Sequence, residues 1–505
     1  MLQRIKSTIR DTLVYSLSNI APKIVGVILL PLYTSKLALG EFGNWDLLDI
    51  TITILSEIFI FGQASSIILL NNTEEYKEKK NSALFTLTLF VFAICAILVL
   101  LTLSAISFFP AMFENRLIEA GYIRLIAYIV LLRVMNSLFL AKVRADEQSI
   151  FYTIISILRI ILVTCITIYF VAGLDLGITG ILYAALIGEI AAIIFLLIKI
   201  IPQMKAKFDT AILSVSIKFG LPLVFSSLGF QLLNLSDRYI IKFLLGAEAL
   251  APYGLAYRVA GVLNMFLILP FNLSLMPIAY KYFNQKDDKR FFSKLMTYST
   301  FFFLWGFVFL SLFGKEIIML FAEQPGFYGA YVVVPVILLS YVFSGMRLTA
   351  SLGMMLTKNT KHLAWITLGS AILNIILNFI FIPLFGIIAA AVDTLVAFVI
   401  FYFVTNSLSN KYYKIPYENY KLVVMIILGV VLSSIIYFLP EMNSILEIMI
   451  KFVLAAIFPL LLFFFKFYER AELEILLSPV KIFDLIKQTL RGTKKTTDDT
   501  EINIK

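Results

Sequence analysis

The sequence predicts an all-α membrane protein that crosses the bilayer about fourteen times. Of its 505 residues, 60% are hydrophobic and 15% are charged, whereas soluble domains are about 45–50% apolar and about 25% charged. Stretches of roughly 20 mostly apolar residues, long enough to span the hydrocarbon core, recur along nearly the whole chain. Because no stretch before the polar tail could form a soluble catalytic domain, we expect the function to be carried out within the membrane.

The apolar stretches define fourteen predicted spans separated by short polar segments. The first one is too long for the apolar core of a signal peptide and lacks a small-residue cleavage site, so we expect it to be retained. The spans lie near residues 12–36, 46–70, 82–109, 121–141, 150–171, 177–200, 212–245, 252–280, 293–314, 328–356, 362–383, 387–409, 420–439 and 445–466.

Lysine and arginine residues predict the orientation, because loops close to span ends retain positive charge on the cytoplasmic side. Of the 42 Lys and Arg residues, 29 lie in segments on one side of the predicted membrane, six lie on the other side and seven fall inside spans. The charge-rich side holds both ends of the chain. The sequence therefore predicts a multi-pass protein with both termini in the cytoplasm.

Two pairs of segments show that the sequence repeats itself. AKVRADEQSIFYTIISILRIIL (141–162) aligns without gaps on LTKNTKHLAWITLGSAILNIIL (356–377), and GITGILYAAL (177–186) aligns on GIIAAAVDTL (386–395). Both copies begin on the predicted cytoplasmic side, which makes them a parallel repeat. Such repeats occur in transporters that move two lobes around a central site.

The repeat divides the chain into four predicted parts. Residues 1–208 form a first six-helix lobe and residues 209–410 form a second one. Residues 411–470 add a pair of spans without a counterpart in the repeat. In the cytoplasmic tail, residues 471–505, the stretch SPVKIFDLIKQTLRG predicts an amphipathic helix on the membrane surface.

Basic residues inside the spans are the candidate binding residues, since a charge at the bilayer centre costs at least a few kcal/mol and usually faces a cavity or a partner. Arginine offers paired donors to phosphate oxygens and lysine offers a compact charge. Lys218 can extend to the headgroups, and Arg238 follows Asp237 in a predicted structural pair. The candidates that remain are Lys23, Arg133, Arg159, Arg258 and Arg347.

Three acidic residues inside spans leave an alternative open. Glu57, Glu189 and Asp393 could pair with the basic residues, although five cations exceed three acids. The same carboxylates are candidates for binding a coupling Na⁺ or H⁺.

Other chemistry is disfavoured by composition. Cys95 and Cys165 lie in apolar spans and the single histidine, His362, lies at a span end, so no disulfide framework, metal site or catalytic triad is predicted. The chain has no phosphate-binding G-x-x-x-x-G-K-[ST] motif, so an ATP-driven exporter would need a separate ATPase subunit. We expect no cofactor.

Two stretches resemble a known family. DRYIIKFLLGAEALAPYGLAYRVAGVLNMFLILPFNLSLMPIAYKYF (237–283) and ILNIILNFIFIPLFGIIAAAVDTLVAF (372–398) resemble the polysaccharide-transporter branch of the multidrug/oligosaccharidyl-lipid/polysaccharide exporter superfamily. The more specific positions of the second stretch are Asn374, Asn378, Pro383 and Gly386.

The resemblance implies a flippase in which two lobes form a V around a central cavity. It would move undecaprenyl-pyrophosphate-linked oligosaccharide, such as an O-antigen unit, from the inner to the outer leaflet of a bacterial inner membrane, driven by an ion gradient or the membrane potential. The expected partners are this lipid-linked glycan, membrane lipids and polysaccharide polymerase machinery. Nucleic acid is not expected as a partner. The protein is expected to be a monomer.

Three alternatives stay open. A peptidoglycan lipid-precursor flippase of the same superfamily would also use cationic cavity residues, whereas a drug/cation antiporter should have an acidic cavity. A membrane-embedded glycan polymerase would be expected to have a large outer loop. The predicted outer loops are short, although one of them holds Glu114, Arg116 and Glu119.

Overall fold

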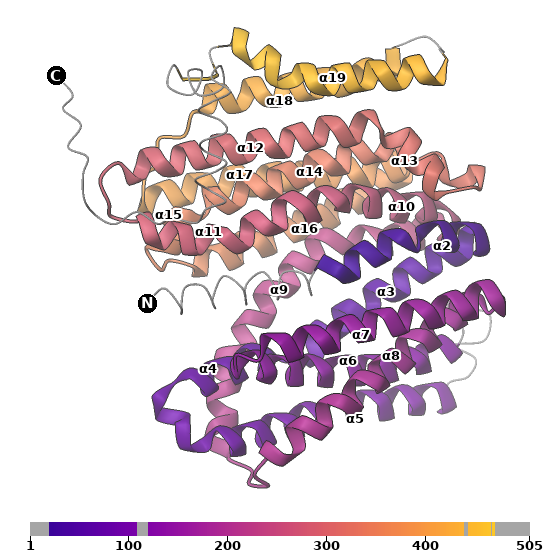
Figure 1. Cartoon of the computed structure of the whole chain (residues 1–505), viewed down its shortest axis with the longest axis vertical. Coiled ribbons are helices and arrows are strands. Elements are labelled where there is room, and N and C mark those ends of the chain that lie inside the picture. Colours follow the sequence, from indigo (N-terminus) through magenta and orange to yellow (C-terminus); the bar gives the residue numbers. More distant parts are fainter. Residues whose placement is uncertain (1–19, 109–119, 439–442, 466, 470–505) are drawn as a thin grey trace. The chain divides into compact units, whose positions relative to one another are not determined.

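The computed structural model describes residues 20–108, 120–438, 443–465 and 467–469, and within these ranges it contains helices and no strands (Figure 1). The chain splits into two compact units, residues 1–417 and residues 418–505. The predicted amphipathic helix of the tail lies outside the described residues. So do Glu114, Arg116 and Glu119 of the predicted outer loop.

The prediction of a polytopic all-α protein is confirmed. Among the described residues, 12 helices are long and apolar enough to cross a membrane, and a bent pair brings the number to 13. The first predicted span begins before the described residues, so the number fourteen stays a prediction. Most helices begin and end within a few residues of the predicted spans.

The first repeat starts with a helical segment at residues 20–28. Its further elements are α2 (Leu30–Lys36), α3 (Leu39–Phe59), α4 (Gln63–Asn72), η1 (Glu74–Lys79), α5 (Lys80–Phe108), α6 (Ala120–Ala145), α7 (Ser149–Ile168), η3 (Tyr169–Gly173), α8 (Gly177–Ile200) and η4 (Ile201–Gln203).

The second repeat begins with the longest helix. Asp209 caps its start by accepting hydrogen bonds from the backbone N–H groups of Ile212 and Ala211, and the bond from Ile212 is the main reason why the pKa of Asp209 is lowered. The elements are α9 (Thr210–Leu245), α10 (Ala247–Leu263), η5 (Asn264–Ile268), α11 (Leu269–Tyr282), α12 (Asp288–Leu312), α13 (Gly314–Phe321), η6 (Pro325–Phe327), α14 (Ala330–Ala350), α15 (Leu352–Leu356), α16 (Lys361–Phe385) and α17 (Ile387–Tyr412).

The second unit contributes a separate pair of helices. They are α18 (Asn419–Ile435), followed by η7 (Ile436–Phe438), and α19 (Ser444–Phe464). They correspond to the two predicted spans that have no counterpart in the repeat.

Breaks in three spans have local causes. The first span is interrupted at Leu29, before Pro31, whose ring cannot supply the backbone donor of a continuous helix. The bend of 42° between α3 and α4 coincides with Gly62, whose φ is +68°. In the second repeat, a π-helical turn precedes Pro270. The discontinuity in the first span lies six residues beyond Lys23.

The aligned starts of α8 and α17 share an unusual backbone conformation. Gly177 has φ +54° and Gly386 has φ +65°, in the region that favours glycine. These two residues occupy equivalent positions in the alignment of the repeats, so the repeat extends to the backbone of the turn.

The two repeats meet closely where α3 and α10 begin. A Cβ atom on Gly43 would collide with the carbonyl oxygen of Ala247, which means that the helix backbones touch there. The Gln324 side chain donates to the carbonyl oxygens of Thr34 and Leu37 at 2.7 and 3.0 Å. We call these contacts the outer seam, because the distribution of Lys and Arg predicts that this end lies outside the cytoplasm. The outer seam comprises the starts of α3 and α10 and the contacts of Gln324 after α13.

A second contact between the repeats lies near the opposite end. Gly62 and Gly220 approach so closely that a Cβ on either would meet the backbone of the other segment. The Ser66 hydroxyl donates to the carbonyl oxygen of Ser216 at 3.0 Å. Helix α9 therefore packs against the first repeat here and against α16 of its own repeat elsewhere.

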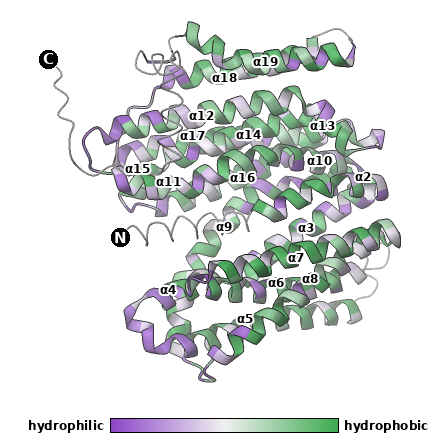
Figure 2. Ribbon diagram, in the orientation of Figure 1, coloured by the Kyte–Doolittle hydropathy of each residue, from purple (hydrophilic) through white to green (hydrophobic). Residues whose placement is uncertain are grey.

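Hydrophobic residues make up much of the helices, while hydrophilic residues gather at helix ends and loops (Figure 2). Leu101 of α5, Ile198 of α8 and Trp365 of α16 are 65%, 68% and 73% exposed. Such residues would destabilise a protein surrounded by water but are compatible with lipid.

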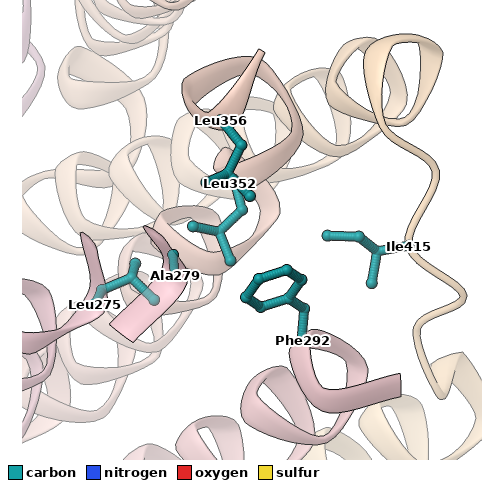
Figure 3. Close-up of a cluster of buried hydrophobic side chains, with 6 residues drawn as sticks. All are labelled: Leu275, Ala279, Phe292, Leu352, Leu356 and Ile415. Atoms are coloured by element: carbon teal, nitrogen blue, oxygen red, sulfur yellow. The ribbon is translucent and has the colours of Figure 1, made fainter. Parts of the chain in front are cut away.

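A buried apolar cluster holds the predicted cytoplasmic end of the second repeat together (Figure 3). Phe292 of α12 lies at its centre and is fully buried. The other members come from α11, α15 and the segment after α17, and they are Leu275, Ala279, Leu352, Leu356 and Ile415.

Phe292→Ala should destabilise the protein by about 3–5 kcal/mol, because it leaves a cavity in this cluster. Phe302→Ala is the matched control on the same helix. Phe302 is 51% exposed, and where it faces lipid its loss should cost less than about 1 kcal/mol. Thermal unfolding in detergent with lipid measures the difference, and equal melting temperatures of the two variants would contradict this packing.

Candidate functional site

A cavity of about 650 Å³ lies between the two repeats. The first repeat lines it with the segment 20–28, α2, α3, α6, α7 and α8, and the second lines it with α10, η5 and α14. Four basic and two acidic residues face it, which gives an excess of two positive charges. These residues are Lys23, Arg133, Arg159, Arg258, Asp49 and Glu189.

Two of the arginines share one carboxylate. Arg133 Nε lies 3.1 Å from Glu189 Oε1, and Arg159 Nη1 lies 3.0 and 3.1 Å from the two carboxylate oxygens of Glu189. The Asn136 amide donates to Glu189 Oε2 at 2.8 Å. Because one negative charge faces two guanidinium groups, this cluster keeps one net positive charge.

The cluster of Arg133, Arg159 and Glu189 is anchored in the protein and open to the cavity. The side chain of Glu189 is 4% exposed, whereas those of Arg133 and Arg159 are 28% and 26% exposed. Each arginine therefore uses some donors on the buried carboxylate and presents others toward the cavity.

The second cluster joins the two repeats. Arg258 of α10 binds Asp46 of α3 through Nη2 at 2.8 Å and Nε at 3.2 Å, and its guanidinium lies 4.1 Å from the centre of the Trp45 ring. Asp49, one helical turn further along α3, lies 3.4 Å from Arg258 Nη2. Arg238 of α9 approaches the other oxygen of Asp46 at 3.3 Å.

Lys23 faces the cavity without a carboxylate partner among the described residues. It is exposed and lies in the helical segment 20–28. Its ammonium is thus the least compensated charge of the cavity lining.

The structure places the other predicted site residues outside the cavity lining. Arg347 stacks on Phe401 at 4.7 Å, and its Nε is buried without a hydrogen-bond partner in the described part of the chain. Glu57 accepts a hydrogen bond from the Ser227 hydroxyl at 2.8 Å. Asp393 is 4% exposed on α17, and its Oδ2 has no partner in that part.

Sequence reasoning missed the two acids of α3. Asp46 and Asp49 lie at the start of the predicted second span, close to the predicted membrane surface. Their spacing of three residues, which places both on one helix face, was the available signal.

The predicted pairing of Asp237 with Arg238 is only partly seen. Arg238 turns to Asp46 of the first repeat, and its backbone N–H alone donates to Asp237. The Asp237 carboxylate accepts from the hydroxyls of Tyr253 and Tyr257, inside the second repeat.

Glu189→Gln should destabilise the protein by about 3–5 kcal/mol, because it leaves two guanidinium groups without their shared countercharge. Glu57→Gln is the control, since an amide oxygen can still accept the bond from Ser227. The measurement is the melting temperature in detergent with lipid. A Glu189 variant as stable as the Glu57 variant would show that Arg133 and Arg159 do not need the negative charge of Glu189.

Comparison with known proteins agrees with the fold. Residues 8–283 match the family described as "Polysaccharide biosynthesis protein", and residues 222–380 match the MatE family. A search of curated proteins gave no match in sequence.

Solved structures with this fold include several transporters. A lipid II flippase MurJ in an inward closed conformation has a TM-score of 0.71 and 16% identity, over 89% of this chain and 99% of that one. An inward-facing multidrug resistance MATE transporter has a TM-score of 0.62 and 14% identity, over 78% and 94%. A superfamily transporter from Pyrococcus furiosus has a TM-score of 0.53 and 14% identity, over 79% and 95%.

The family resemblance predicted from the sequence is thereby confirmed, and the matches are to transporters and flippases, not to enzymes. The chain belongs to the polysaccharide biosynthesis protein family, within the multidrug/oligosaccharidyl-lipid/polysaccharide exporter superfamily.

Proposed function

We propose that this transporter is a flippase for undecaprenyl-pyrophosphate-linked oligosaccharide, which it moves from the inner to the outer leaflet of the bacterial cytoplasmic membrane by alternating access. The observation that carries the proposal is the excess of two positive charges on the cavity lining. A pyrophosphate that links a lipid to a sugar carries about two negative charges, so the head of the substrate would balance the cavity.

The donor types support a phosphate ligand. Arg258, Arg133 and Arg159 present planar groups that bind phosphate oxygens in pairs, and Lys23 adds a mobile point charge. Low dielectric surroundings strengthen each of these interactions compared with water. The polyprenyl tail would remain among the lipids.

The packing of the repeats supports alternating access. The repeats touch at the outer seam, and the residues of α3 and α10 that line the cavity follow this contact along both helices. In the proposed cycle, the substrate head enters from the cytoplasmic leaflet, and the two lobes then rock about the cavity to open the outer side.

The drive is also part of the proposal. Moving a net negative charge outward across an inside-negative membrane releases roughly 2.3 kcal/mol per charge per 100 mV. Glu189 is engaged by two arginines, so Glu57 and Asp393 are the better placed of the three predicted coupling acids. A Na⁺ or H⁺ taken up at one of them would help to return the empty carrier.

The charge of the cavity also bears on two related functions. Transport of the peptidoglycan lipid precursor is the second candidate, because the structural neighbour with the higher TM-score is described as a lipid II flippase and the cavity cations do not discriminate between diphosphate lipids. Export of cationic drugs is disfavoured, since the cavity would repel a cation.

Lys23→Ala and Arg258→Ala should each reduce flipping at least tenfold, because each removes a charge-assisted contact worth about 1.5–3 kcal/mol. Lys23→Arg should retain part of the activity. The measurement is display of surface polysaccharide, normalised to the amount of protein in the membrane.

Lys218→Ala is the matched control. Lys218 is an exposed lysine of α9 that does not line the cavity, so its loss should change display less than about twofold. Normal display in both cavity variants would contradict the proposed role of these cations.

A further inference from the structure

We propose that Asp49 is a built-in competitor for the anion position on Arg258, and that binding of a diphosphate displaces it and loosens the outer seam. Asp49 would thus couple occupation of the cavity to opening of the outer side. The inference rests on the proposed function, because it assumes an anionic ligand.

The order of residues along the two helices places this contact at a boundary. On α3, Gly43 touches the backbone of α10 in the outer seam, Asp46 is buried behind it, and Asp49 already faces the cavity. On α10, Ala247 lies in the seam and Arg258 faces the cavity. A ligand arriving from the cavity therefore meets the contact between Asp49 and Arg258 before any other part of the closure.

The two acids differ in how firmly they are held. Asp46 is 4% exposed and lies between Arg258 and Arg238, so its departure would leave the buried guanidinium of Arg238 and the partly buried one of Arg258 without their shared countercharge. Asp49 is 47% exposed and makes a single contact of 3.4 Å with Arg258. Asp46 is accordingly the fixed partner of Arg258 and Asp49 is the exchangeable one.

Exchange fits the chemistry of Arg258. Its guanidinium is held in place by Asp46 and by the Trp45 ring, so the position that Asp49 occupies is preformed for an oxyanion. A phosphate oxygen, like a carboxylate oxygen, is negatively charged and accepts paired hydrogen bonds from a guanidinium group. A diphosphate brings about two charges, and Lys23 in the same cavity attracts it further.

Displacement of Asp49 would give the ligand different contacts in the closed and open states. A ligand can shift a conformational equilibrium only if its contacts differ between the two states. With a phosphate on Arg258, the released Asp49 carboxylate faces another anion. Repulsion between the bound anion on α10 and Asp49 on α3 then acts across the outer seam. The empty site, by contrast, is attractive and favours closure.

The first test measures binding of inorganic pyrophosphate in the purified full-length protein, with Trp305→Phe and Trp365→Phe so that Trp45 is the remaining tryptophan. Because Arg258 lies on the Trp45 ring, its fluorescence should respond to the ligand. Asp49→Asn should bind pyrophosphate about three- to tenfold more tightly than the parent protein. Asp49→Glu should behave like the parent protein.

Asp175→Asn is the matched control. It also removes a carboxylate that pairs with a cation, Lys36, at 2.8 Å, but it lies outside the cavity and is 71% exposed. Its affinity for pyrophosphate should be unchanged.

The second test measures the distance across the outer seam by electron spin resonance. Spin labels on Ala38→Cys and Glu323→Cys, two exposed positions, report it in a protein without Cys95 and Cys165. Pyrophosphate should shift the parent protein toward longer distances, and Asp49→Asn should show part of this shift without ligand.

The two proposals fail in different ways. If pyrophosphate does not bind the parent protein, the proposed function and the competitor role both fall. If it binds with equal affinity to the parent protein and to Asp49→Asn, and the distance distributions coincide, the competitor role is overturned and the proposed function stands.

Discussion

Positive charge held inside the membrane is the constraint on which the rest of the structure depends. In each of two clusters, a pair of guanidinium groups shares one well-buried carboxylate, Glu189 in the first repeat and Asp46 at the junction of the repeats. Removing a buried partner from such a cluster costs about 3–5 kcal/mol, so the acids are needed for stability. In the first cluster Glu189 neutralises only one of the two arginines, so one positive charge remains available to a ligand.

Closure of the outer side and binding in the cavity depend on the same helices. Helix α3 carries the small residue that lets the backbones touch, the buried acid that fixes Arg258 and the exposed acid that faces the cavity. A change in charge at Arg258 therefore acts close to one of the contacts between the repeats. An exposed ion pair contributes only about 0–1 kcal/mol, which suits a contact that would be broken in every cycle of the proposed transport.

Much of the fold could be predicted from the sequence because a span of apolar residues is a local signal. The starts of α7, α8, α16 and α17 agree with the predicted spans to within one residue. The site was harder to predict, because its partners are far apart in the chain: Arg258 and Asp46 are separated by 212 positions. Arg347 was chosen from its depth in the membrane alone, and depth does not tell which way a side chain points. Its guanidinium stacks on the ring of Phe401 and does not line the cavity.

The central claim is that uncompensated cavity charge carries an anionic head outward, and flipping under an imposed membrane potential tests it most directly. Vesicles containing the purified protein and an undecaprenyl-pyrophosphate-linked short glycan would be given a potassium diffusion potential of either sign. The account predicts faster movement toward the positive side, since each charge gains roughly 2.3 kcal/mol per 100 mV. Equal rates at both signs and at zero potential would contradict it and indicate passive exchange of the lipid.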